Sequence, residues 1–278
     1  MGTLDYTTVV GVDRKHLEQL ALTWPTWKRH KPGLLERPIL VFRDASQVRE
    51  ASVREVVDHP DLTVVAWPPI HADNYHGVSA DGKFGNAQRY KMIAGFVHVP
   101  AAFVTTKWWL KLDTDTVATG MDDWIDPSWF ESERETVIAA QSWGFTKPPN
   151  QMIELDDWIR KNLSYNPKFF LLDASPPLNL FPKDGWSRVR HKRIISWCGF
   201  FRTDFTQWCS DLAESSCGRG KLPVPSQDGY MWYMATRARL EVVRCGMKSR
   251  GWQHWSTMEN IGRASKEAMD NGKQDTSA

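Results

Sequence analysis

Short apolar runs alternate with longer mixed segments through the first half of the chain. Residues 7–12, 38–42, 62–67 and 107–112 have the length and the β-branched or aromatic content of buried strands. A segment long enough for a helix separates each run from the next. Strands that alternate with helices are typical of a mostly parallel sheet with helices on both faces. The pattern therefore predicts an α/β fold of the Rossmann-like kind.

The segments between the runs carry apolar residues at helical spacing. The first helix is expected to begin after Asp13, whose side chain can cap it, and to end or kink at Pro25. Further helices are expected at residues 47–59 and 86–99. These three helices would cover the faces of the sheet.

The second half of the chain is less regular. Residues 127–190 are rich in proline, tryptophan and charge, with few long periodic stretches. A strand is expected at residues 194–202, a helix at 228–239 and a last short strand at 240–244.

The sequence favours a single domain. It has neither an internal repeat nor a Gly/Ser linker, and 278 residues can bury a core without disulfide or metal staples. Residues 264–278 are small and polar, as in disordered termini. We therefore expect one domain at residues 1–263, followed by a disordered tail.

Composition narrows the class of protein further. The formal net charge of +2 and the ordinary apolar and charged fractions indicate a soluble globular protein, with no general basic surface for nucleic acid. Neither a signal-peptide pattern nor an apolar run of about 20 residues is found, so a cytoplasmic protein is expected. The four cysteines are expected to be reduced, with a bridge from Cys209 to Cys217 as the alternative. Most of the 15 tryptophans should fill the core.

The most informative segment is the strand at residues 107–112, which runs directly into Asp113-Thr114-Asp115. Residues i and i+2 of an extended chain point to the same side, so the two carboxylates can converge. In an open α/β sheet this point lies beyond the carboxyl end of a strand, where ligands bind. A divalent cation would offset the repulsion between the carboxylates and leave positions open for phosphate oxygens. The alternative is an Asp-Thr-Asp turn that only caps local amides.

This arrangement resembles the GT-A glycosyltransferases over roughly residues 7–256. In that family an apolar strand ends in Asp-x-Asp, and the aspartates hold Mn²⁺ or Mg²⁺ against the diphosphate of a nucleotide sugar. The resemblance implies a transferase for a UDP- or GDP-linked sugar. Asp113 and Asp115 would bind the metal, with Asp113 also facing the donor.

The resemblance also implies a donor pocket at the ends of the first two strands. Gly11, Asp13 and Asp44 occupy the places where the family binds base and ribose, and Gly11 would allow the ligand to approach closely. Arg89 and Lys91 lie on the helix before Asp-x-Asp, which often supplies a cation to the ribose or phosphates. The alternatives are ordinary strand ends and a solvated helix face.

Residues late in the chain would complete the site. Asp228 opens a helix at the place where inverting members carry the catalytic base, and His254 matches a late histidine that binds the same metal. Gly199 would allow the donor sugar to approach, and Trp197 could stack on an acceptor. The alternatives are a helix cap, a packed histidine and a plain buried strand. A retaining course stays open if Asp228 is structural.

Two other functions fit the same residues. A metal-dependent nucleotidyl- or phosphotransferase also pairs aspartates at a strand end, and a non-catalytic module could bind a nucleotide or glycan. The acceptor class is open between glycan, small molecule, protein, lipid and modified nucleic-acid base. The basic run at residues 188–193 would suit an anionic acceptor such as DNA, although such runs are more often solvated loops.

Overall fold

The protein is represented by a computed structural model. It describes residues 4–67, 75–77, 94–120, 123–130, 136–144, 154–155, 158–159, 161–162, 192–215, 222–224, 227–237 and 241–271. Structural statements below concern these residues.

A seven-stranded sheet forms the centre of the molecule, in the order β10-β7-β8-β5-β1-β2-β3. Its strands are β1 (Tyr6–Val12), β2 (Ile39–Arg43), β3 (Leu62–Ala66), β5 (Trp108–Leu112), β7 (Thr136–Gly144), β8 (Lys192–Arg202) and β10 (Glu241–Arg244). Strand β8 is antiparallel to both of its neighbours, and the other pairings of the sheet are parallel. The expected mostly parallel α/β sheet is confirmed.

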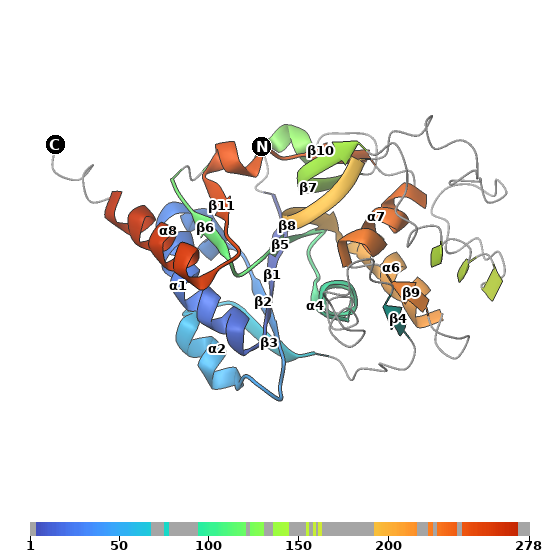
Figure 1. The fold of residues 1–278 in the computed structure, drawn as a ribbon, viewed down its shortest axis with the longest axis horizontal. Coiled ribbons are helices and arrows are strands. Elements are labelled where there is room, and N and C mark those ends of the chain that lie inside the picture. Colours follow the sequence, from blue (N-terminus) through green and yellow to red (C-terminus); the bar gives the residue numbers. More distant parts are fainter. Residues whose placement is uncertain are drawn as a thin grey trace.

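Helices cover both faces of this sheet (Figure 1). They are α1 (Arg14–His30), α2 (Glu50–Val56), α4 (Val99–Phe103), α6 (Thr203–Ser215), α7 (Gln227–Arg237) and α8 (Met258–Asn271). Helices α1 and α2 pack on one face, and α4, α6 and α7 pack on the other (Figure 1). Two small sheets lie outside the main one, formed by β6 (Thr116–Ala118) with β11 (Trp252–His254) and by β4 (Tyr75–Gly77) with β9 (Leu222–Val224).

The alternation along each central strand divides the core between the two faces. Val9 and Trp109 belong to the apolar cluster under α6 and α7, whereas Val10 and Leu110 belong to the cluster under α1. Successive side chains of a strand point to opposite faces, so a strand buried on both sides is apolar throughout. This explains the continuous apolar runs of the sequence.

Helix α1 runs through Pro25 and ends at His30, so of the two expected outcomes, an end or a kink at Pro25, the first is wrong. Trp24 and Trp27 are both buried in the cluster between α1 and the sheet. Burial of two such side chains outweighs the few kcal/mol that proline costs inside a helix. Tertiary packing therefore overrides the local signal.

The prediction of a disordered tail is wrong for residues 264–271, which form the second half of α8. Ile261, Ala264, Ser265 and Ala268 are buried, at the spacing of one helical face. The period was present in the sequence, but the small and polar residues concealed it. The remaining tail, residues 272–278, lies outside the described residues.

Other elements were placed less completely by the sequence. The helix expected at 86–99 is described only from Ala94, where a π-helix, η3 (Ala94–His98), leads into α4. Strand β7 and helix α6 were not predicted. Both belong to the less regular half of the chain.

Candidate functional site

Asp113 and Asp115 lie at the carboxyl end of β5, in a turn and not in an extended segment. The backbone N–H of Thr116 donates to the carbonyl of Asp113 at 3.2 Å, which closes this turn. The N–H of Asp113 donates to the carbonyl of Trp197 on β8 at 2.9 Å. The two aspartates are thus fixed by the backbone of the main sheet.

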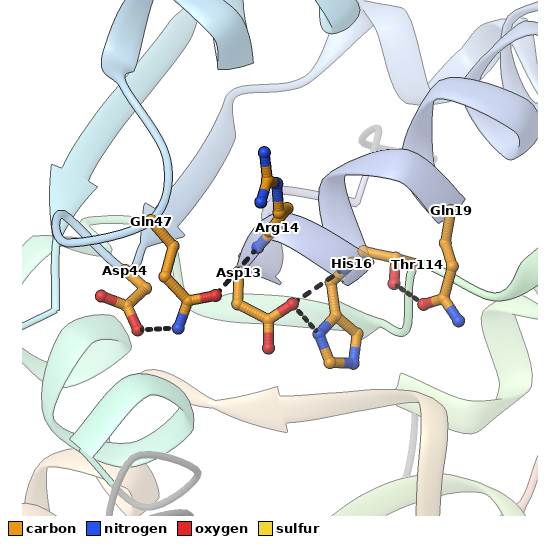
Figure 2. Close-up of polar contacts among 7 residues, drawn as sticks. All are labelled: Asp13, Arg14, His16, Gln19, Asp44, Gln47 and Thr114. Carbon is orange, nitrogen blue, oxygen red and sulfur yellow. Dashed lines mark hydrogen bonds and ion pairs between the residues drawn. The ribbon is translucent and has the colours of Figure 1, made fainter.

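Helix α1 holds the same turn from the other side. Thr23 Oγ1 donates to the carbonyl of Thr114 at 2.9 Å, and Trp27 Nε1 donates to the carbonyl of Thr116 at 2.6 Å. Thr114 Oγ1 donates to Oε1 of the buried Gln19 at 2.8 Å, as Figure 2 shows. A turn anchored through its backbone leaves the aspartate side chains available for other partners.

The ribbon of β6 and β11 brings His254 to this turn. β6 begins directly after Asp115, and His254 is paired across the ribbon with Thr116. The N–H of Trp255 donates to the carbonyl of Asp115 at 3.1 Å. His254 Nε2 consequently lies 3.1 Å from Asp115 Oδ1.

Asp113, Asp115 and His254 form a cluster suited to a divalent cation. One ligand atom from each residue lies within 4.8 Å of the other two. Opposite ligands of a small hard cation lie about 4.2 Å apart, so only a small adjustment is needed. Asp115 Oδ1 is buried, and His254 Nε2 is its one polar contact among the described residues. A buried carboxylate oxygen beside a second carboxylate and an imidazole fits Mn²⁺ or a similar ion.

Charged groups converge on Asp113. Burial raises the pKa of Asp113, the adjacent Lys111 ammonium opposes this rise, and the charges of Asp115 and Asp228 add to it. The net result is a raised pKa. The Asp228 carboxylate on α7 is the smallest of these contributions. A bound cation would offset this accumulation of negative charge.

His254 is held between a carboxylate and an indole. Burial lowers its pKa, but the hydrogen bond and charge of Asp115, together with the charge of Asp113, outweigh burial and raise the pKa. The His254 ring is stacked on the Trp197 ring, with centroids 5.5 Å apart and planes at 22°. Trp197 therefore contacts a candidate ligand, a contact that the sequence did not predict.

Asp13 and Asp44 lie at the ends of β1 and β2, where both take part in local hydrogen bonds (Figure 2). Asp13 Oδ1 accepts from the N–H of His16 at 2.9 Å, which confirms the expected helix cap. Asp44 is buried and accepts from Ser46 N and from Gln47 Nε2, at 3.0 and 2.8 Å. Asp44 therefore shapes the loop after β2, while Asp13 keeps an oxygen outside its cap hydrogen bond.

The space beside Gly11 is filled by a side chain. A Cβ on Gly11 would lie 2.4 Å from Cζ of Phe42. The Phe42 ring therefore occupies the space that the absence of a Cβ leaves beside Gly11. The sequence had suggested that a bound ligand would occupy this space. Gly199 lies in β8 opposite Lys111, next to the site.

Some expected contributors lie outside the described residues. These are Arg89 and Lys91, together with residues 188–191 of the basic run. Cys198, Cys209 and Cys245 are free and buried, whereas Cys217, the other member of the alternative bridge, lies outside the described residues.

Comparison with solved structures identifies the fold. The chain superimposes on core-mannan synthase A from Aspergillus fumigatus, in a form with Mn and GDP, with a TM-score of 0.56 and 13% identity over 91% of this chain and 75% of that one. It also superimposes on the galactosyltransferase LgtC in complex with donor and acceptor sugar analogues, with a TM-score of 0.50 and 9% identity over 94% and 95%. The chain has the fold of the GT-A glycosyltransferases. No protein-family model and no curated protein matches the sequence.

Among the described residues, none of the helices is long and apolar enough to cross a bilayer.

The sequence analysis did not identify Lys111, whose ammonium contacts Asp113 and lies over the ring of Phe96, 4.5 Å from its centroid. Lys111 precedes Asp113 by two residues on a buried strand. Residues i and i+2 of a strand point to the same side, which places Lys111 on the side of Asp113. A lysine inside an apolar strand was the available signal.

Proposed function

We propose that this protein is a metal-dependent glycosyltransferase that moves a sugar from a UDP- or GDP-linked donor to an acceptor hydroxyl. The observation that carries the proposal is the convergence of Asp113, Asp115 and His254 beyond the carboxyl end of β5. Ligands of open α/β sheets bind at this edge. The GT-A fold supports the same chemistry, since both solved relatives named above are glycosyltransferases.

Asp113, Asp115 and His254 would hold the cation. When bound, a divalent cation supplies Lewis-acid stabilisation of the negative charge that develops on the leaving nucleoside diphosphate. The buried Oδ1 of Asp115 would be the most direct ligand, with His254 Nε2 3.1 Å from it. Lys111 compensates the charge of Asp113 from within the strand.

Asp228 would act as the general base. It lies in the first turn of α7, where the helix dipole favours the ionised carboxylate. The contribution of its charge to the raised pKa of Asp113 supports this role. The Asp228 carboxylate would take the proton of the acceptor hydroxyl as its oxygen attacks the anomeric carbon, with inversion of configuration.

The donor would lie along the ends of β1 and β2. Asp13 would bind the base or ribose through the carboxylate oxygen outside its cap hydrogen bond. Asp44 shapes this edge by fixing the loop after β2, and Gly11 shapes it by leaving room for the Phe42 ring. Arg89 and Lys91 would add positive charge at the diphosphate, and Gly199 would leave room for the donor sugar.

The metal role is tested by Asp115→Asn. We expect at least a hundredfold loss of nucleoside diphosphate release in Mn²⁺, because the ion would lose its most direct ligand. Asp211→Asn, on the exposed face of α6, is the matched control and should keep wild-type activity. Full activity of the wild-type protein in EDTA would reject the metal role. Release of pyrophosphate would instead indicate a nucleotidyltransferase, and binding without turnover a binding protein.

The base is tested by Asp228→Asn, which keeps the shape of the side chain and removes its basicity. Positioned general bases contribute about 10² to 10⁴ in rate, so kcat should fall by that factor. The dissociation constant of the donor, measured by calorimetry, should stay within about threefold because the base acts on the acceptor. An unchanged kcat would remove Asp228 from this role.

A further inference from the structure

The orientation of His254 depends on a neighbour outside the candidate ligand set. Its Nε2 atom faces Asp115 Oδ1 at 3.1 Å, while one face of its ring lies against Trp197. Metal-binding histidines usually fix their ring by donating the other nitrogen to an oxygen acceptor. Among the described residues, no hydrogen bond reaches Nδ1 of His254, and about a third of its side chain is exposed. The stacked indole therefore takes the place of a hydrogen bond at Nδ1 and, together with the contact to Asp115, limits rotation of this ring.

Trp197 is itself held firmly. Its carbonyl accepts the N–H of Asp113 at 2.9 Å, and the next residue, Cys198, is paired with Leu112 across β5 and β8. The Trp197 side chain also packs against the cluster of buried residues under α1. One residue thus fixes the backbone of Asp113 and the ring of His254.

We propose that Trp197 is a positioning residue for the metal site, which holds the imidazole so that Nε2 points at the cation. This inference rests on the proposed metal-dependent function. It differs from the stacking of Trp197 on an acceptor, because His254 already occupies one face of the indole. A flat aromatic surface is needed, since an aliphatic side chain of similar size would let the ring rotate.

The test compares Trp197→Leu with Trp197→Phe by Mn²⁺ titration, with free Mn²⁺ followed by electron paramagnetic resonance and without any sugar present. Loss of groups that orient metal ligands typically costs 10- to 100-fold in affinity, so the leucine variant should bind Mn²⁺ at least about tenfold more weakly. The phenylalanine variant should stay within about threefold. Trp67→Leu is the control: this half-buried indole packs near Phe42, with centroids 6.0 Å apart, and should leave the affinity unchanged.

A second measurement serves if the leucine variant does not fold. Bound Mn²⁺ is paramagnetic and should quench the emission of an indole stacked on its ligand, so the wild-type protein should lose fluorescence that Trp197→Phe does not lose. Equal quenching in both proteins contradicts the inference. Wild-type Mn²⁺ affinity in Trp197→Leu, with a raised KM for the acceptor, would make Trp197 an acceptor platform. Failure of the wild-type protein to bind Mn²⁺ would contradict the proposed function as well.

Discussion

Phe42 shows how one side chain fixes the identity of two glycines. Phe42 is paired with Gly11 across β1 and β2, and its ring also fills the space beside Gly95 of the π-helix. A Cβ on Gly95 would lie 2.2 Å from Cε2 of this ring. Close-packed cores do not accommodate such overlap without moving the ring or the backbone. Both glycines therefore leave the space that the buried Phe42 ring needs beneath the edge of the sheet where the donor is expected to bind.

Gly11→Ala should lower the free energy of unfolding by about 1–3 kcal/mol, because the added methyl group overpacks the core against Phe42. Urea denaturation would measure the change. The loss should be smaller in a Phe42→Leu background, and an equal loss there would contradict this explanation. Gly262→Ala is the matched control. Gly262 lies within α8 with open space beside it, so alanine should raise the stability by about 0.5–1 kcal/mol.

The β6–β11 ribbon is the element on which the site depends most. Its far end is closed by the hydrogen bond from Thr119 N to the carbonyl of Gly251 at 2.8 Å. The fully buried Lys31 donates to the carbonyls of Gly120 and Arg250, so α1 is tied to both strands of the ribbon. The pairing register of β6 with β11 that is fixed at this end determines which residue of β11 lies beside Asp115 at the other end of the ribbon.

Gly251→Ala should destabilise the ribbon more than Gly120→Ala. Both glycines have positive φ, +74° and +72°, and alanine costs about 1–2 kcal/mol in that region. Only at Gly251 would the Cβ also collide, at 2.2 Å from the carbonyl oxygen of Gly120. In Gly251→Ala we expect the free energy of unfolding to fall by at least about 1 kcal/mol more than in Gly120→Ala, and Mn²⁺ to bind more weakly. Chemical denaturation of the two variants compares them directly, and equal losses would show that the collision is relieved.

At the scale of the whole molecule, stability is linked to pH through His98, at the junction of η3 with α4. His98 Nδ1 lies 2.7 Å from Ser210 Oγ on α6. Burial lowers the pKa of His98 from 6.5 to about 4. The exposed Glu214 carboxylate, 3.8 Å from Nδ1, does not offset burial. The unfolded chain therefore binds a proton between pH 6.5 and 4 that the folded protein excludes.

Acidification from pH 6.5 to pH 4 should therefore destabilise the fold through His98, by up to about 3 kcal/mol, because each pKa unit corresponds to about 1.4 kcal/mol. His98→Asn keeps a polar atom near Ser210 and cannot take up a proton. Thermal unfolding across this pH range should show a shallower loss for the variant than for the wild-type protein. If the stability of both proteins falls equally with pH, groups other than His98 cause the loss of stability in acid.

Much of the fold was predictable because the signals for its strands and helices lie in short, continuous stretches of the sequence. The strands β1, β2, β3 and β5 follow from short apolar runs, and the cap of α1 follows from Asp13. The Asp113-Thr114-Asp115 segment at a strand end was enough to indicate the candidate metal site. Strand β7 and helix α6 were missed in the less regular half of the chain. Helix α1 continues through Pro25 because packing outweighs the local signal of proline. Helix α8 was missed because its small and polar residues concealed the helical period.

The alternating elements, the mostly parallel sheet and the acidic pair at the end of β5 follow from the amino-acid sequence alone. The positions of His254 beside Asp115, of Trp197 against His254 and of Phe42 in the space at Gly11 follow only from the folded chain. Periodicity and capping involve residues close along the chain, whereas these contacts join strands that are distant in sequence. Their geometry is set by strand register and side-chain packing, which exist only once the whole sheet has formed.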